Sequence, residues 1–597
     1  IYERGAKLKS YVATLYSDWN TNFSTEIRGS YLELDNRQIP VGGTDFGEIR
    51  VELDDVDVYL GADDSRHANK LDYDVTTFVF KGRYDLGNHY LTFGVEREDL
   101  DIFNMFVQHV ETEIRFDGME NFRNGYADAI YYNNSPTQNP EDAAALWGYK
   151  TNTLYLQDEF YPTNRLQLVI GARYDWYQTN DKPAENADFV ADYGFSNSQT
   201  LDGEGLFQPR IGFVFDISDQ SVLRGGIGLY SGGNPNVWLS NNYSANNVMQ
   251  FGQRGRSFGY TDGTRSLFDD DVVYEAIESN APAGAGPGWG VPKELYDAVG
   301  EGVGDNFEIN YLDPNFKIPS EWKFSLGFDH FFDSGMRFSA DLLITEGKDS
   351  AMILHGDLEQ IGTNEDGYPI YDSVREPSFV LTNSNKGNRS RTLSFMLAQE
   401  HDNGIRWDVG YAWNDADDIQ PMTSSVAFSN YTNRAFFDPQ EDVRSTSNYN
   451  IKHRFTGNFR WDKNVFGNST FRLAFVGTAS SGQPFSYAYD GTIDPYGFTP
   501  YLDFLDIVLE PGDKRNGERN SWWGKIDMRM SLDFRGIRES DRVELFMIVD
   551  NLTNLLNDDW GVLKQHNFPA TVPEGTRAPR IGDASRYEIR VGLKYSF

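Results

Sequence analysis

The last stretch of the chain alternates strictly between apolar and polar residues. Residues 586–597 read RYEIRVGLKYSF, and the alternation continues over six pairs of positions. A period of two is typical of a β-strand with one apolar and one polar face. Taken alone, this segment fits either a strand of a transmembrane barrel or an amphipathic edge strand of a soluble β-sandwich. Only the rest of the chain distinguishes these two interpretations. The predicted apolar face consists of Tyr587, Ile589, Val591, Leu593, Tyr595 and Phe597.

The segment 165–179 shows the same alternation with charges on one face. Its apolar positions include Leu168, Tyr174 and Trp176, whereas Arg173 and Asp175 occupy the opposite face. Charged groups need water or polar partners, because burying them alone is costly. We therefore expect an apolar medium on one side of this strand and a hydrated space on the other.

Short turns alternate with long connections along the chain. Eight short turns each join two strands of roughly ten to fourteen residues, which is long enough to cross a membrane at a tilt. The turns lie at residues 20–21, 85–88, 162–164, 218–220, 333–335, 402–404, 463–468 and 536–541. The long connections are 180–205, 232–319, 348–387, 415–449, 481–520 and 554–585, and a long irregular stretch covers 104–149.

This asymmetry predicts an all-β protein, a transmembrane antiparallel β-barrel with short periplasmic turns and long extracellular loops. Six structureless loops of this length would be anomalous in a cytosolic domain. The eight hairpins and the last strand amount to about seventeen strands. Because bacterial single-chain barrels have an even number of strands, we expect further strands before Ile1.

The composition agrees with strands rather than helices in the membrane. The mean hydropathy is -0.55, and no run of 18 apolar residues occurs, which excludes helical membrane spans. Only alternate residues of a barrel strand meet lipid, so the apolar signal of each strand averages out. Aromatic residues make up 15% of the chain and can supply the girdles at the membrane interfaces.

Charge and residue types exclude several functions. The net charge of -37 argues against nucleic acid as a partner, and the absence of cysteine excludes thiolate chemistry. The eight histidines are scattered and form no catalytic or metal-binding motif, so we predict no enzymatic activity and no cofactor. An acidic triplet is a candidate for structural Ca²⁺ in a loop, with a solvated acidic loop as the alternative: Asp269, Asp270 and Asp271.

The longest connection, 232–319, carries side chains that are suited to bind a ligand. Amides and aromatic faces can hold sugars, peptides or metal chelates through hydrogen bonds and stacking. In the alternative, Trp238 packs within the loop or joins the interfacial aromatic belt, and the sequence leaves both open. The candidate ligand-binding residues are Asn234, Asn236, Trp238, Asn241, Asn242 and Tyr243.

Several segments resemble one family of membrane receptors. They are LRGGIGLYSGGNPNVWLS at 223–240, DPNFKIPSEWK at 313–323 and VDNLTNLLN at 549–557. They are similar to TonB-dependent outer-membrane receptors, specifically the Oar-like branch, and the resemblance spans nearly the whole chain. It implies a barrel of 22 strands that is occluded by an N-terminal plug. The last strand also resembles the C-terminal strand by which outer-membrane barrels are recognised for assembly.

The resemblance sets the expected function and location. Residues 1–597 would be the barrel part of a longer protein, since the plug, the TonB-contacting box and the first strands are not found in this chain. We expect an integral protein of the bacterial outer membrane that contacts lipid and lipopolysaccharide, and that is coupled to TonB through the missing N-terminal segment. Its extracellular loops, 232–319 among them, would capture a large or scarce peptide, glycan or metal chelate for energy-coupled import. The alternative is a passive or structural barrel: a diffusion channel, an adhesin platform or a secretion conduit.

Overall fold

A computed structural model describes most of the chain. The described residues are all those outside positions 1, 42, 44–46, 55, 270, 276–290, 305–307, 366, 374, 376, 468, 489–507, 510–511, 539 and 567–570. None of the helices formed by the described residues is long and apolar enough to span a membrane.

One antiparallel sheet dominates the described part of the molecule. It contains seventeen long strands and the two-residue strand β25, so the predicted fold class and the predicted number of strands are confirmed. Each long strand pairs with the long strands that precede and follow it in the sequence. The strands are β1 (Tyr2–Asp18), β2 (Phe23–Pro40), β5 (Ala68–Asp85), β6 (His89–Val107), β9 (Ala145–Thr163), β10 (Leu166–Gln178), β11 (Gly205–Ser218), β12 (Ser221–Ser231), β17 (Ser320–Phe331), β18 (Arg337–Lys348), β23 (Arg389–Glu400), β24 (Ile405–Asp418), β25 (Ser445–Thr446), β26 (His453–Phe466), β27 (Ser469–Ser480), β30 (Trp523–Arg535), β31 (Arg542–Asp550) and β33 (Glu588–Ser596).

The eight predicted turns join these strands into hairpins. The first hairpin pairs β1 with β2 without a break, from Tyr2 opposite Pro40 to Asp18 opposite Ser24. In the turn between β23 and β24, Gly404 has a φ of +84°. A Cβ at this position would lie 2.0 Å from the backbone oxygen of Asp462, so the turn requires glycine.

One face of the sheet carries a continuous apolar surface. Four residues in register across β10, β11, β12 and β17 form one of its rows, and each is between 37% and 46% exposed. An apolar row of this kind is stable when lipid covers it, because water then loses contact with the side chains. The predicted orientation of segment 165–179 is therefore confirmed. The row consists of Ile170, Ile211, Ile227 and Phe324.

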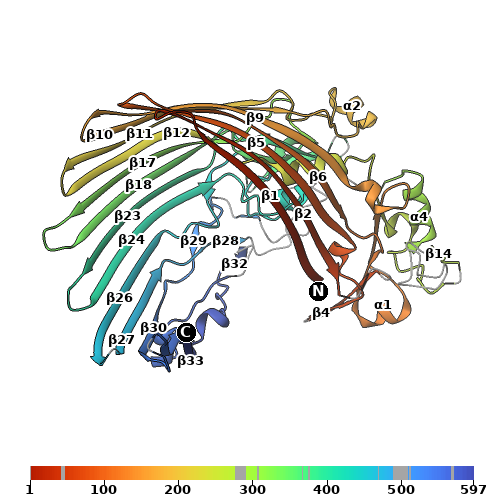
Figure 1. The fold of residues 1–597 in the computed structure, drawn as a ribbon. Coiled ribbons are helices and arrows are strands. Elements are labelled where there is room, and N and C mark those ends of the chain that lie inside the picture. The colour runs from red at the N-terminus through yellow and green to blue at the C-terminus, as the bar shows by residue number, and fades with distance from the viewer. Residues whose placement is uncertain are drawn as a thin grey trace.

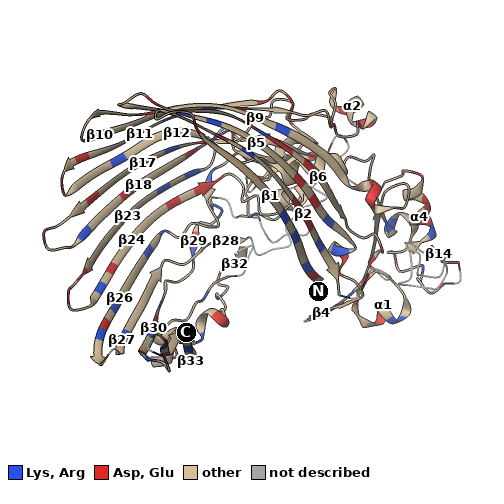
Figure 2. Ribbon diagram, viewed as in Figure 1, with Lys and Arg blue, Asp and Glu red and all other residues tan. Residues whose placement is uncertain are grey.

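The opposite face of β10 is polar. Asp175 is 6% exposed and accepts hydrogen bonds from Thr153 and Gln208, each at 2.6 Å. Nε of Arg173 donates to the same carboxylate at 2.8 Å, and its Nη1 donates to Glu96 at 3.0 Å. The charges are tolerated because both Asp175 oxygens have donors. Figure 2 shows charged residues of both signs along the strands of the sheet.

The connections opposite the short turns have secondary structure of their own, and α1, α2 and α4 lie at this end (Figure 1). The prediction of an irregular stretch over 104–149 was wrong, because β6 continues to Val107 and two strands and two short helices follow before β9. Strand β7 pairs in parallel with β3 from a different connection, a contact between distant segments. The elements of the connections are β3 (Glu48–Leu53), β4 (Val56–Leu60), η1 (Asp64–Arg66), β7 (Glu113–Asp117), α1 (Gly118–Asn124), β8 (Ala129–Asn134), η2 (Pro140–Ala143), α2 (Ala187–Tyr193), α3 (Asn236–Ser244), β13 (Phe251–Arg254), η3 (Gly255–Phe258), β14 (Tyr274–Glu275), β15 (Val291–Pro292), α4 (Lys293–Gly300), β16 (Ile309–Leu312), β19 (Ala351–His355), β20 (Leu358–Thr363), β21 (Pro369–Ser373), β22 (Ser378–Asn383), α5 (Ala427–Thr432), β28 (Pro484–Ala488), β29 (Glu518–Arg519), α6 (Leu552–Leu556), β32 (Thr571–Pro573) and η4 (Asp583–Ser585).

The largest buried apolar cluster of the described residues lies where the connections pack against the ends of the strands opposite the short turns. It combines Trp147 and Tyr177 from the sheet with Leu239 and Tyr243 from α3 and Phe379 from β22. The rings of Trp147 and Tyr243 are stacked, with centroids 5.1 Å apart. Because stacked aromatic pairs add to the free energy of burial, this cluster fixes α3 against the inner wall of the sheet.

The sheet is strongly curved and open. Figure 1 shows it curling round with β1 and β33 at its two edges. Strand β1 pairs with β2, and β33 pairs with β31. Among the described residues neither edge strand has a second partner, so each edge presents unpaired backbone N–H and C=O groups.

Candidate ligand-binding site

A cavity of about 1280 Å³ lies between the inner wall of the sheet and the connections. Strands β5 and β6 form one side of it, and α3, α5, β8 and β13 contribute to the others. Side-chain amides are the commonest polar groups in its lining and can both donate and accept hydrogen bonds. They belong to Asn36, Gln38, Asn69, Asn104, Gln108, Asn133, Asn234, Asn236, Asn241, Gln250, Asn310 and Asn433.

The charge of the cavity lining is opposite to that of the whole chain. Four arginines line the cavity, against two carboxylates, Glu98 and Glu308, although the net charge of the chain is -37. Arginine presents several N–H donors and no acceptor, so it favours carboxylate, phosphate and other acceptor groups. The cavity is therefore suited to a polar ligand with many acceptor oxygens. The arginines are Arg4, Arg66, Arg115 and Arg254.

Two of these arginines are held by one aromatic ring. The guanidinium carbons of Arg115 and Arg254 lie 4.9 Å and 4.7 Å from the ring centroid of Tyr131. The ring of His109 stacks on Tyr131 with centroids 5.2 Å apart. Cation–π contacts of this kind orient the guanidinium planes, and these two arginines form the positive wall of the cavity.

A family model described as an outer membrane beta barrel domain matches residues 16–525. The chain belongs to this family. It is thus an integral outer-membrane protein, in agreement with the location and the barrel predicted from the sequence.

A solved structure of an outer-membrane transporter agrees with the fold of this barrel. The outer membrane transporter YddB from Escherichia coli has a TM-score of 0.57 at 11% identity, over 99% of this chain and 63% of that protein. The siderophore receptor PirA from Acinetobacter baumannii has a TM-score of 0.49 at 11% identity, over 99% and 62%. The chain thus spans less than two thirds of the length of these relatives. A search of curated proteins finds no match.

Three of the predicted ligand-binding residues of the barrel line the cavity: Asn234, Asn236 and Asn241. The hydroxyl of Tyr149 donates to Asn236 Oδ1 at 2.9 Å and accepts from Asn234 Nδ2 at 2.9 Å. Nδ2 of Asn241 donates to the backbone oxygen of Ser425 at 2.9 Å. These partners orient the amides at the cavity wall, and their contact with a ligand stays a prediction.

The other three predicted residues make contacts within the protein, and their role in ligand binding also stays a prediction. Nε1 of Trp238 donates to the backbone oxygen of Ser424 at 2.9 Å, and Asn242 is 2% exposed. Tyr243 is buried against Trp147 and donates its hydroxyl to the backbone oxygen of Asp181 at 2.9 Å. None of the three is among the residues that line the cavity. The packing alternative stated for Trp238 describes its position in the structure.

The sequence did not point to the cavity residues on β5 and β6. Residues 98, 100, 102, 104 and 106 share the inward face of β6 and all line the cavity. Their alternation is visible in the sequence, and the polar residues Glu98 and Asn104 on this inward face could have marked the wall. The other walls come from connections whose folding the sequence did not predict.

Two of the predicted Ca²⁺ ligands, Asp269 and Asp271, lie outside the cavity lining. Asp269 accepts a hydrogen bond from the backbone N–H of Ser266 at 2.9 Å, and Asp271 pairs with Arg265 at 3.5 Å. Asp270 lies outside the described residues. Binding of Ca²⁺ by this triplet therefore stays a prediction.

The predicted apolar residues of the C-terminal segment are exposed, four of them on β33 and two, Tyr587 and Phe597, just outside it, with Val591 77% and Phe597 96% exposed. The strand spans Glu588–Ser596 and is shorter than the predicted 586–597. Its alternation is as predicted, whereas its role in assembly stays a prediction.

Glu308 gives the cavity a pH-dependent contribution to stability. Burial raises the pKa of its carboxyl to about 7, against the opposing charge of Arg254. A raised carboxyl pKa means that the folded state favours the protonated form, so stability falls as pH rises from about 4.5 to about 7. We expect Glu308→Gln to stabilise the protein at pH 8 and to have little effect at pH 5. Thermal melting in detergent at pH 5 and pH 8 measures the change in melting temperature. An equal change at both pH values would contradict the expected pH dependence.

Proposed function

We propose that this chain is the barrel part of a TonB-dependent outer-membrane transporter of the Oar-like branch. In this proposal the cavity between the sheet and the connections captures a large or scarce ligand. Energy-coupled movement of a plug then lets the ligand pass through the barrel. The observation that carries the proposal is the cavity of about 1280 Å³ with its lining of amides and arginines. A cavity of this size with convergent polar groups is typical of a specific binding site.

The two unpaired edges of the sheet are an argument for further strands in the complete barrel. Both edges, β1 and β33, have unpaired backbone groups among the described residues, and unpaired groups in a membrane are costly. We propose that additional strands close the sheet to 22, the number found in plugged outer-membrane transporters. The plug and the TonB-contacting box belong to the same proposal, as do contacts of the loops with lipopolysaccharide.

Among peptides, glycans and metal chelates, the cavity lining favours anionic ligands. Peptides, glycans and metal chelates all offer hydrogen-bonding groups to the amides. The excess of arginine over carboxylate favours a ligand that carries carboxylates or other anionic groups, such as an acidic peptide, an acidic glycan or a carboxylate chelate.

Ligand capture tests the proposal. The full-length protein, solubilised in detergent, would be incubated with pools of anionic and neutral peptides and oligosaccharides, and retained compounds would be identified by native mass spectrometry. We expect retention of anionic compounds. The double variant Arg115→Gln/Arg254→Gln should lose roughly 10- to 100-fold in affinity, because charge-assisted hydrogen bonds are lost.

The matched control is Arg37→Gln, since Arg37 pairs with Asp35 on β2 and does not line the cavity. This variant should bind like the wild type. Retention of neutral and anionic compounds alike, or equal losses in the control, would contradict the assignment of the cavity as the capture site.

A further inference from the structure

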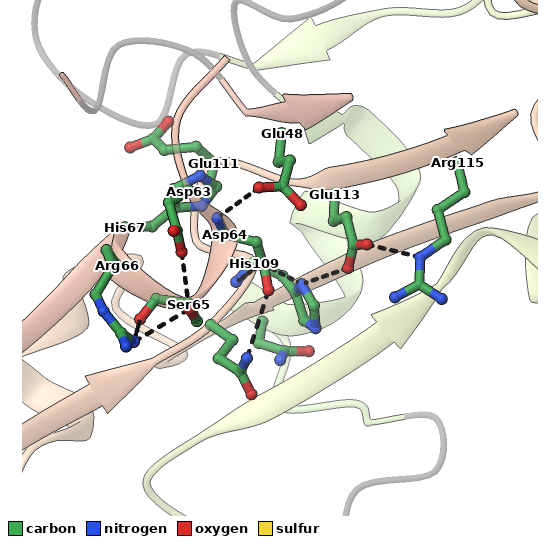
Figure 3. Close-up of polar contacts among 12 residues, drawn as sticks. Glu48, Asp63, Asp64, Ser65, Arg66, His67, His109, Glu111, Glu113 and Arg115 are labelled. Atoms are coloured by element: carbon green, nitrogen blue, oxygen red, sulfur yellow. Dashed lines mark hydrogen bonds and ion pairs between the residues drawn. The ribbon is translucent and has the colours of Figure 1, made fainter. Parts of the chain in front are cut away.

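Three side chains from two different connections converge beside the cavity. Figure 3 shows His109 between Asp64 of η1 and Glu113 of β7. Nδ1 of His109 lies 2.5 Å from Oδ1 of Asp64 and 3.3 Å from Oε2 of Glu113. One ligand atom from each residue lies within 4.8 Å of the others, so small side-chain movements would let all three contact one ion.

The cluster is shielded from water. Asp64 is 9% exposed and Glu113 is 3% exposed, and the His109 side chain is 14% exposed. Two carboxylates this close in a poorly solvated place repel each other unless a cation lies between them. Nδ1 of His109 lies within ion-pair distance of both carboxylates, so a proton on the imidazole and a bound metal ion are alternative ways to hold the two carboxylates together.

Other groups hold the carboxylates in position. Nε of Arg115 donates to Oε1 of Glu113 at 2.6 Å, which leaves Oε2 on the side of His109. The backbone N–H of His109 donates to Oδ1 of Asp64 at 3.0 Å, and Gln108 donates to Oδ2 at 3.4 Å. Contacts of this kind orient the ligands of a metal ion.

A second imidazole lies beside the cluster. His67 is 7% exposed, and its Nδ1 accepts from the backbone N–H of Glu111 at 3.3 Å. The ring also interacts with the backbone of Ala62 and with the side chains of Asp64 and His109. His67 is therefore held in place next to the proposed ligands.

We propose that Asp64, His109 and Glu113 bind a divalent transition-metal ion, with Zn²⁺ as the best match. Imidazole nitrogen and carboxylate oxygen are both ligands of Zn²⁺, and a water in the fourth position would complete a four-coordinate site. Ca²⁺ and Mg²⁺ prefer oxygen ligands alone. Tetrahedral bonds of about 2.1 Å place ligand atoms roughly 3.4 Å apart, so Asp64 and His109 separate by about 1 Å on binding.

The ion would fasten two connections to each other at the cavity wall. Asp64 lies between β2 and β5, whereas His109 and Glu113 lie between β6 and β9. His109 itself lines the cavity and stacks on Tyr131, the ring between the two arginines. Metal binding would therefore stiffen the positive wall of the cavity, whichever ligand the protein captures.

Metal titration tests the proposal without reference to transport. The full-length protein would be purified from outer membranes in detergent, treated with EDTA, desalted and titrated with Zn²⁺ by calorimetry, and with Co²⁺ followed by its visible absorption. We expect one Zn²⁺ per chain and Co²⁺ bands typical of four-coordinate N/O ligation. His109→Gln and Glu113→Gln should each weaken binding at least about tenfold, whereas Asp271→Asn, in the acidic triplet, should leave it unchanged.

Folding of each variant is checked by its heat-dependent mobility in SDS gels, so that loss of binding is separated from loss of structure. If His109→Gln does not fold, Glu113→Gln carries the test alone. Stoichiometric binding that persists in a folded variant would overturn the proposal. So would binding well below one ion per chain, or a loss of binding in Asp271→Asn. Because none of these readouts depends on ligand capture, the site can fail while the proposed transport function stands.

Discussion

Replacing Ile170 with arginine is expected to destabilise the barrel by about 2–4 kcal/mol and to reduce its assembly into the membrane. Ile170 lies in the middle of β10, is 46% exposed and faces outward in register with Ile211. An arginine there would carry its charge into the hydrocarbon region, where it has no water or partner. Urea unfolding in lipid vesicles measures the stability, and the amount of protein in outer-membrane fractions measures the assembly.

The matched control is Gln167→Arg, on the opposite face of the same strand. Gln167 lies near the short turn and donates to Glu159 at 2.6 Å, so an arginine there has a carboxylate partner. This variant should assemble normally. Equal losses for Ile170→Arg and Gln167→Arg would mean that the outward face does not meet lipid.

Removing the carboxylate of Asp175 should have a second large effect, a loss of roughly 3 kcal/mol in unfolding free energy. Asp175→Ala leaves Arg173 without its nearest carboxylate and leaves the donors of Thr153 and Gln208 without their acceptor. Buried polar groups without partners are destabilising even where the deleted side chain was small. Chemical unfolding of the refolded protein measures the change.

Asp216→Ala is the control for that experiment, because Asp216 lies on β11 at an exposed position. It should change stability by less than about 0.5 kcal/mol. A loss for Asp175→Ala as small as that of the control would show that the polar network inside the sheet contributes little to stability.

The long strands were predictable because their information is local. The alternation at Tyr174, Asp175 and Trp176 identifies both the strand and its two faces, and the short turns fix where each hairpin reverses. Strand ends were less accurate. Strand β2 continues to Pro40 and β6 to Val107, because pairing with neighbours extends strands beyond the clear alternation.

The connections could not be predicted because their structure depends on contacts between distant segments. Strand β7 has only five residues, and its first residue pairs with Glu48 of another connection. Asp64 and His109 meet although many residues separate them, and no spacing motif marks them as ligands. The cavity is assembled in the same way, so the predicted residues of 232–319 gave only part of its wall.

Conductance of the full-length protein in planar lipid bilayers tests the central claim most directly, since it separates an energy-coupled transporter from a passive barrel. The protein would be purified from outer membranes with any plug in place. Our account predicts no steady open-channel current, because the plug fills the barrel until energy coupling moves it. A steady, ungated current through the intact protein would contradict the transporter and identify a diffusion channel.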